Sequence, residues 1–259
     1  MKAAELFDLT GEVALVTGAS SGLGRRFARV LAANGARVAC VARRAERLEA
    51  LVGEIEAAGG RAVAAQADAT DDAAMGRAFD RAQEALGPVT ILVNNAGIGR
   101  SQRLVETDRA KWRETLDINL DALHFAGIAF VERAIQAGRG GAIVNIASIL
   151  GLGVGRGLGA YAVAKAGVIQ LTRAMALEYA KHGIRANAIA PGYFATEINA
   201  GHLAGEGQAM TRDIPLRRFG QEGELDGALL LLASPKAGAY TTGATYVVDG
   251  GHSIRLTGH

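Results

Sequence analysis

Short apolar runs alternate with amphipathic helical patterns along the chain, and this alternation restricts the fold more than any other feature. The first run, residues 12–17 (E-V-A-L-V-T), is β-branched and ends in glycine-rich sequence, which predicts a buried strand. Six further strands are expected at residues 36–42, 61–66, 89–93, 141–147, 184–190 and 243–249. Helices are expected between them, at residues 46–58, 71–86, 108–137, 160–182 and 222–233. This order predicts an α/β fold: a doubly wound (Rossmann) seven-stranded parallel sheet with helices on both faces, in a single domain over residues 1–259.

The composition narrows the classes of protein to consider. Of 259 residues, 49% are hydrophobic and 21% charged, and the net charge of +2 comes from mixed acids and bases. We therefore expect no nucleic-acid surface and no membrane-binding face. The single cysteine, Cys40, excludes an internal disulfide. Glu5 and Asp8 interrupt the region where a signal peptide needs an apolar stretch, so the expected location is cytoplasmic.

A glycine-rich turn joins the first predicted strand to the first predicted helix. It reads Gly18-Ala19-Ser20-Ser21-Gly22-Leu23-Gly24, and the helical pattern after it ends at Asn34-Gly35. Strand, glycine turn and helix is the geometry that points a helix N-terminus at a phosphate group. The spacing Gly-x-x-x-Gly-x-Gly matches the general dinucleotide fingerprint only loosely, and a plain strand-to-helix turn is the alternative.

The end of the second predicted strand indicates which dinucleotide is bound. An acidic residue there accepts a hydrogen bond from the 2′-hydroxyl of NAD, but Arg43 and Arg44 occupy this position. Arginine suits the 2′-phosphate of NADP. The alternative is that both arginines are solvated residues at the start of a helix. We predict NADP, with NAD possible.

Polar residues follow several of the predicted strands. Asp68 follows the third strand, where it can meet an adenine amino group or cap the next helix. Asn94 and Asn95 follow the fourth strand and either line a ligand crevice or form a turn. Asn119 lies among apolar residues of a long predicted helix, so it is either buried, at a helix irregularity that holds water, or on the exposed side.

Tyr161 and Lys165 are four residues apart, which is about one turn of helix. A helix places both on one face, and a cation beside a phenol lowers the phenol pKa, so Tyr161 can transfer a proton near neutral pH. Ser148 ends the fifth predicted strand, and a glycine-rich stretch, residues 151–159, separates it from Tyr161. The spacing of Tyr161 and Lys165 alone also fits a tyrosine over an apolar surface with an exposed lysine nearby.

Several motifs occur together and in order, and with them the chain resembles the short-chain dehydrogenase/reductase family over nearly all its length. They are Thr17 to Gly24 (T-G-A-S-S-G-L-G), Asn94-Asn95-Ala96-Gly97, Asn119, Ser148, Tyr161-x-x-x-Lys165, Pro191-Gly192 and Val248-Asp249-Gly250-Gly251. Ser148 precedes Tyr161 by 13 residues, the spacing usual in the family.

The resemblance implies a hydride transfer between a nicotinamide cofactor and a ketone or secondary alcohol. Tyr161 is then the acid in reduction and the base in oxidation. Lys165 binds the nicotinamide ribose and lowers the phenol pKa, Ser148 binds the substrate oxygen, and Asn119 holds a water that links Lys165 to solvent. A carbonyl that accepts hydride develops negative charge on its oxygen, and such donors stabilise that charge.

The resemblance also implies a set of cofactor-binding residues. Ser21 stands where many NADP-dependent members carry a basic residue, so recognition of the 2′-phosphate rests on Arg43 and Arg44. The implied set is Thr17, Gly18, Ser20, Ser21, Gly22, Leu23, Gly24, Arg43, Arg44, Asp68, Ala69, Asn95, Ala96, Gly97, Tyr161, Lys165, Pro191, Gly192, Phe194 and Thr196.

Residues 193–215 follow the sixth strand with mixed composition and are expected to form a substrate loop or lid. Phe194 and Met210 in this loop, with Ile98 and Leu150 near Tyr161, favour a mostly apolar, medium-sized substrate. The family commonly forms tetramers through two long helices, and residues 108–137 and 160–182 suit that role, so a homotetramer or dimer is expected.

Three alternatives remain. A cofactor-binding sensor without turnover is possible on the same fold, although it has no need of Ser148, Tyr161 and Lys165 together. An epimerase or dehydratase of the related larger family usually carries an added domain, for which 259 residues leave little room. A metal-dependent alcohol dehydrogenase is disfavoured because one cysteine and five scattered histidines form no recognisable site.

Overall fold

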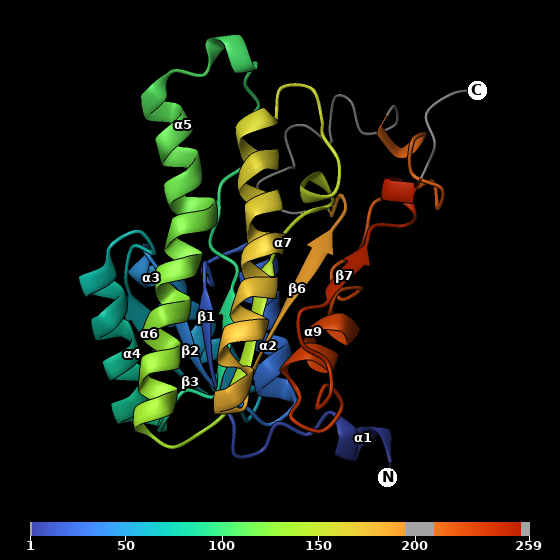
Figure 1. The fold of residues 1–259 in the computed structure, drawn as a ribbon. Coiled ribbons are helices and arrows are strands. Elements are labelled where there is room, and N and C mark those ends of the chain that lie inside the picture. Colours follow the sequence, from blue (N-terminus) through green and yellow to red (C-terminus); the bar gives the residue numbers. More distant parts are fainter. Residues whose placement is uncertain (1, 195–209, 255–259) are drawn as a thin grey trace.

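Seven parallel strands, in the order β3-β2-β1-β4-β5-β6-β7, form the centre of the computed structural model, which describes residues 2–194 and 210–254 (Figure 1). The order and direction confirm the predicted doubly wound sheet. The strands are β1 (Val13–Thr17), β2 (Arg37–Ala42), β3 (Arg61–Gln66), β4 (Ile91–Asn94), β5 (Gly141–Ile146), β6 (Ile184–Pro191) and β7 (Thr245–Val248).

Two layers of helices cover the sheet because successive strand residues face opposite sides. Ala14 and Val16 pack with α2, α3 and α9, whereas Val13 and Leu15 pack with α4, α6 and α7. The helices are α1 (Ala3–Leu6), α2 (Gly22–Ala33), α3 (Ala45–Ala57), α4 (Asp72–Leu86), α5 (Arg109–Leu116), α6 (Ala122–Gln136), α7 (Gly159–Tyr179) and α9 (Asp226–Ala233). Among the described residues, no helix is both long enough and apolar enough to cross a membrane.

The strand order changes side at β1: β2 and β3 follow on one side of it, and β4 to β7 lie on the other. This strand pairs with β2 on one side, with Val13 opposite Arg37, and with β4 on the other, with Ala14 opposite Ile91. Connections from β1 and β4 leave toward opposite faces of the sheet, so a crevice opens at the carboxyl ends of these strands, where ligands bind in open α/β sheets.

The long helix predicted at residues 108–137 is one continuous helical segment with an irregularity. Asp108 caps it by accepting a hydrogen bond from Lys111 N over 2.9 Å. A π-helical turn, Asp117–Asp121, joins α5 to α6 and contains the buried Asn119. The extra residue in a π turn re-aims the side chains around it, and such turns occur often at functional sites.

Candidate active site

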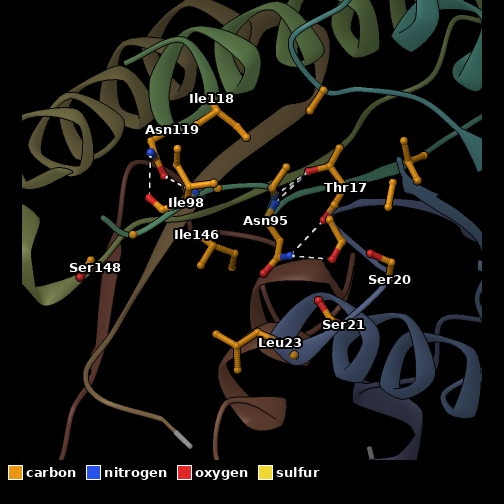
Figure 2. Close-up of a pocket in the computed structure, with 18 of the residues that line it drawn as sticks. Thr17, Ser20, Ser21, Leu23, Asn95, Ile98, Ile118, Asn119, Ile146 and Ser148 are labelled. Carbon is orange, nitrogen blue, oxygen red and sulfur yellow. Dashed lines mark hydrogen bonds between the residues drawn. The ribbon is translucent and has the colours of Figure 1, made fainter. Parts of the chain in front are cut away.

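A cavity of about 570 Å³ runs along the carboxyl ends of the central strands. Every predicted site residue in the described part of the chain lines it, with the exception of Gly24. Thr196 lies outside the described residues, as does most of the predicted substrate loop. Figure 2 shows Ser20 and Ser21 at one end of the cavity and Asn119 and Ser148 at the other.

We call the two parts of the cavity the glycine end and the tyrosine end. The glycine end comprises Thr17, Gly18, Ser20, Ser21, Gly22, Leu23, Arg43, Arg44, Asp68, Ala69, Asn95 and Ala96. The tyrosine end comprises Gly97, Ile98, Asn119, Ser148, Tyr161, Lys165, Pro191, Gly192 and Phe194.

The turn at the glycine end requires glycine at particular positions. Gly18 and Gly22 have φ of +68° and +52°, which L side chains rarely adopt. A Cβ at Gly18 would also lie 2.8 Å from Asn95 Nδ2. Gly24 does not line the cavity but packs against the Gly18 carbonyl and Asn95, where a Cβ has no room. Gly24 therefore acts through packing, and the turn delivers the N-terminus of α2 to the cavity.

Thr17 and Asn95 lock the glycine turn to the segment after β4 (Figure 2). Thr17 Oγ1 accepts hydrogen bonds from Asn95 N and Ala96 N, each over 3.0 Å, and donates to Val93 O over 3.4 Å. Asn95 Nδ2 donates to Thr17 O over 3.0 Å. One buried hydroxyl thus satisfies two backbone N–H groups between β1 and β4, where the strand order changes side.

The two arginines after β2 are held differently. The Arg44 guanidinium donates to Ser20 Oγ and to Ser21 Oγ, each over 2.8 Å, and so lies against the glycine turn. Arg43 Nη1 lies 3.8 Å from Asp68 Oδ2, and the Arg43 side chain is 69% exposed. Arg44 is therefore the better fixed of the two cations.

Asp68 does not cap the helix that follows it. Its carboxylate accepts hydrogen bonds from Thr70 N and Thr70 Oγ1, whereas Asp71 caps α4 by accepting from Ala74 N. Burial acts against ionisation of Asp68, but the hydrogen bonds from Thr70 and the charge of Arg43 outweigh it and keep the carboxyl pKa below its usual value. Asp68 is thus an ionised acceptor at the edge of the glycine end.

Lys165 is the most constrained charged residue of the tyrosine end. Only 4% of the residue is exposed, and its Nζ donates to Ile146 O over 2.8 Å. Burial disfavours the ammonium and lowers the pKa of Lys165 to about 8. The Nζ atom lies 5.6 Å from the centroid of the Tyr161 ring.

The pKa of Tyr161 is shifted in the direction opposite to the one expected from the sequence. Burial of the phenol raises its pKa, and the hydrogen bond with Ser148 opposes this effect without reversing it. The net shift therefore runs opposite to the lowered phenol pKa expected from the sequence, because desolvation of the phenolate dominates. Ser148 Oγ also accepts a hydrogen bond from Leu150 N over 3.1 Å, which fixes the serine side chain beside Tyr161.

Asn119 is fully buried, as one of the two sequence-based interpretations proposed. Its Nδ2 donates to Ile98 O over 3.0 Å and its Oδ1 accepts from Ile98 N over 3.2 Å (Figure 2). The Nδ2 atom also donates to Thr115 O over 2.9 Å. The amide thereby ties the segment after β4 to the π turn. Its side-chain bonds among the described residues go to backbone atoms.

Sequence reasoning missed several apolar residues that line the cavity. They are Val41, Ala42, Ala67, Ile118, Ile146 and Ala147. Most of them are the last residues of strands or follow strands directly. Their positions at predicted strand ends could have identified them, because ligands in open α/β sheets meet the carboxyl ends of several strands.

The donor set of the glycine end fits a dinucleotide. Serine hydroxyls, the N-terminus of the 12-residue helix α2 and two guanidinium groups line it, and all of them suit phosphate oxygens. At the other end, a phenol, an ammonium and a hydroxyl converge on one part of the cavity. The fold and the site together define a dinucleotide-dependent α/β oxidoreductase.

Comparisons with known proteins agree with this class. A sequence model described as short chain dehydrogenase matches residues 12–207, so the chain belongs to this family. The galactitol 2-dehydrogenase (L-tagatose-forming) of Cereibacter sphaeroides is 44% identical, with 96% of this chain and 98% of that protein covered. The gluconate 5-dehydrogenase of Gluconobacter oxydans is 39% identical, with coverage of 97% and 98%.

A solved structure gives the same result. The gluconate 5-dehydrogenase of Burkholderia cenocepacia, in complex with NADP and tartrate, superposes with a TM-score of 0.93 at 34% identity, with 98% of this chain and all of that chain covered. The predicted family, fold class and reaction class are confirmed. The protein is an NAD(P)-dependent oxidoreductase that interconverts secondary alcohols and carbonyl compounds.

Proposed function

We propose that Tyr161 transfers the proton and that the glycine end prefers NADP in the reversible reduction of a ketone to a secondary alcohol. The observation that carries this proposal is the convergence of Ser148, Tyr161 and Lys165 on the cavity that also contains the glycine turn. When bound, the nicotinamide supplies or accepts the hydride.

The chain itself moves the proton and stabilises the developing charge. In reduction, the Tyr161 hydroxyl donates its proton to the carbonyl oxygen, which becomes the alcohol oxygen as the carbon receives the hydride. Ser148, held by Leu150 N, binds the same oxygen. The buried Lys165 ammonium binds the nicotinamide ribose and favours the phenolate that Tyr161 becomes.

The glycine end supports the choice of cofactor. The turn from Gly18 to Gly24 receives the pyrophosphate at the start of α2. Arg44, fixed by Ser20 and Ser21, supplies a guanidinium for a 2′-phosphate, and Arg43 adds a second cation. These residues compensate for the missing basic residue at Ser21, and we propose NADP as the preferred cofactor with NAD as a weaker one.

The described walls of the tyrosine end favour a substrate with an apolar, medium-sized body. Ile98 and Phe194 line the cavity there, and Ile118, the chain neighbour of Asn119, lines it as well. A polyhydroxy substrate is the second candidate, because the relatives named above act on galactitol and gluconate. The two candidates differ in the groups that surround the reacting carbon, whereas the proton transfer by Tyr161 is the same.

Three further expectations belong to this proposal. We propose that residues 193–215 form a substrate loop within the single domain. The chain forms a homotetramer or dimer through the helical segment of residues 109–136 and α7. It acts in the cytoplasm. Phe125, Val163 and Leu177 are exposed apolar residues of α6 and α7, which supports an interface on these helices. Light scattering tests the oligomer, and a monomer would remove that claim.

Turnover of a substrate panel tests the proposed function. NADPH and NADH oxidation are followed with cyclohexanone, L-tagatose and 5-ketogluconate, and wild type is compared with Tyr161→Phe. We expect NADPH-dependent turnover that is lost in the variant, and the better ketone decides between the apolar and polyhydroxy candidates. Tight NADPH binding without turnover on any ketone supports the cofactor-binding sensor instead.

A further inference from the structure

A series of buried polar side chains crosses the fold directly behind the cavity. Asn94 in β4 and Asn145 in β5 are register partners, and each is at most 2% exposed. Asn94 Nδ2 donates to Asn145 Oδ1 over 3.0 Å, and Asn145 Nδ2 donates to Thr172 Oγ1 over 2.9 Å. Thr172 lies in α7, the helix that carries Tyr161 and Lys165 (Figure 1). We call Asn94, Asn145 and Thr172 the polar bridge.

The polar bridge joins four elements. Thr172 Oγ1 donates to Val168 O one turn earlier in α7, over 2.7 Å. Asn94 Nδ2 also donates to Leu123 O in α6, over 3.3 Å. The bridge therefore links β4, β5, α6 and α7 through directional bonds in the centre of an otherwise apolar layer.

Stability alone does not account for the polar bridge. Asn94 Oδ1 is buried and accepts no hydrogen bond within the described structure. A buried polar atom without a partner lowers the stability of the fold. Apolar side chains of similar size can often replace buried polar groups without loss of stability. Directional bonds differ from apolar packing in that they fix how neighbouring elements are oriented.

The polar bridge is next to Lys165 of the tyrosine end, through the chain neighbour of Asn145. Ile146, the neighbour of Asn145, accepts the hydrogen bond from Lys165 Nζ. Thr172 follows Lys165 by seven residues, about two helical turns, so both side chains project from the same face of α7. The Asn145–Thr172 and Ile146–Lys165 bonds are thus two successive links between β5 and α7.

We propose that Asn145 and Thr172 are positioning residues: their hydrogen bond sets the rotation and depth of α7 against β5 and thereby places Lys165 Nζ between Ile146 O and Tyr161. This inference rests on the roles proposed above for Tyr161 and Lys165. The influence of an ammonium on a phenol depends on their separation. A small rotation of α7 therefore changes proton transfer at Tyr161 without any change in the catalytic side chains themselves.

Thr172→Val is the variant that tests the proposal. It removes the hydroxyl at nearly constant size and leaves Asn145 Nδ2 with the weak acceptor Met175 Sδ, 3.7 Å away, in place of the Thr172 oxygen. Thr172→Ser keeps the hydroxyl and should behave as wild type. Thr90→Val is the matched control, because the buried Thr90 hydroxyl accepts from Val13 N over 3.1 Å at the opposite end of the sheet. If Thr172→Val does not fold, Thr172→Cys replaces the hydroxyl by a weaker acceptor and is assessed in the same way.

The first readout needs neither substrate nor cofactor. Carbon-13 NMR of labelled lysine follows the titration of Lys165 in the full chain, and the signal is assigned by its loss in Lys165→Met. We expect the titration midpoint of Lys165 to move by about half a pH unit or more in Thr172→Val, because a group's pKa follows its hydrogen bonds and burial. Thr172→Ser and Thr90→Val should keep the wild-type midpoint.

The second readout is turnover. We expect kcat of Thr172→Val to fall about tenfold, with a smaller change in the KM for NADPH, since general acid–base catalysis depends on the placement of these groups. The proposal is overturned if Thr172→Val loses thermal stability as Thr90→Val does but keeps the Lys165 titration and kcat of wild type. Failure of the proposed function appears differently, as unimpaired turnover in Tyr161→Phe, and the lysine titration stays informative in that case.

Discussion

The glycine end of the cavity is built mainly from backbone and small side chains, whereas the tyrosine end is built from buried functional side chains. At the glycine end, Thr17 and Asn95 fix two backbone segments, and the exposed Arg43 and Arg44 are added at the rim. At the tyrosine end, Lys165 and Asn119 are almost fully buried. The first arrangement suits binding of phosphates, and the second suits control of a proton. Each prediction below perturbs one of the two ends.

Tyr161→Phe is expected to have the largest effect and to act on the tyrosine end alone. Loss of the proton donor should lower kcat by about 10²- to 10⁴-fold, the usual contribution of general acid–base catalysis. NADPH affinity, measured by fluorescence titration, should change little, because the phosphate contacts lie at the glycine end. Tyr179→Phe, at the end of the same helix, is the control. A variant that keeps a tenth of wild-type turnover would show that another group donates the proton.

Thr17→Val perturbs the glycine end. The substitution removes the oxygen that accepts from Asn95 N and Ala96 N. Two partly buried N–H groups without partners should lower the free energy of unfolding by about 2 kcal/mol. Urea denaturation measures this change. Thr17→Ser keeps the oxygen and should restore most of the stability. Equal stability of Thr17→Val and Thr17→Ser would contradict the assigned role of the hydroxyl.

Much of the fold and part of the site could be predicted from the sequence. Parallel strands such as β3 are continuous apolar runs between turn residues, and the predicted bounds of residues 61–66 agree with Arg61–Gln66. Ser148, Tyr161 and Lys165 were found because each motif is local and chemically distinctive. For the π turn at Asn119, the sequence offered a helix irregularity as one of two interpretations. The bond between Asn145 and Thr172 was not predictable in this way, since it depends on a contact between elements far apart in the chain.

The pKa of the Tyr161 phenol is a second property that could not be predicted from the sequence. The spacing of Tyr161 and Lys165 predicts a nearby cation, which is present 5.6 Å from the ring centroid. The spacing contains no information about desolvation, which raises the pKa of Tyr161 and lowers that of Lys165. Burial is a property of the whole fold, so the direction of these shifts emerged only from the structure.

Lys165→Met should change how stability depends on pH. The folded-state pKa of Lys165, about 8, lies below its unfolded value of roughly 10.4, so the burial cost is fully present below pH 8. As pH rises above 8 the folded chain releases this proton first, and wild type should gain about 2 kcal/mol relative to Lys165→Met between pH 7 and pH 9.5. Urea denaturation at both pH values measures the difference, with the exposed Lys181→Met as control. Parallel pH curves for wild type and Lys165→Met would show that burial does not shift this lysine.

The arginines should give the smallest effect, confined to the choice of cofactor. Arg44→Ala removes the guanidinium held by Ser20 and Ser21 and should weaken NADPH binding about tenfold while NADH binding is unchanged. Arg43→Ala should have a smaller effect because its side chain is largely exposed. Fluorescence titration with both cofactors checks this order, with Arg29→Ala on the outer face of α2 as control. An equal loss of NADH affinity would place Arg44 elsewhere than at the 2′-phosphate.

Transfer of deuterium from the cofactor is the most direct test of the central claim, that this cavity brings a nicotinamide and a carbonyl carbon together beside Tyr161. NADPH labelled with deuterium at C4 is incubated with the ketone that turns over best, and the alcohol product is analysed by mass spectrometry and NMR. We predict one deuterium on the carbinol carbon with wild type and no labelled product with Tyr161→Phe. Product without deuterium at that carbon, or the same label from both proteins, would contradict the account.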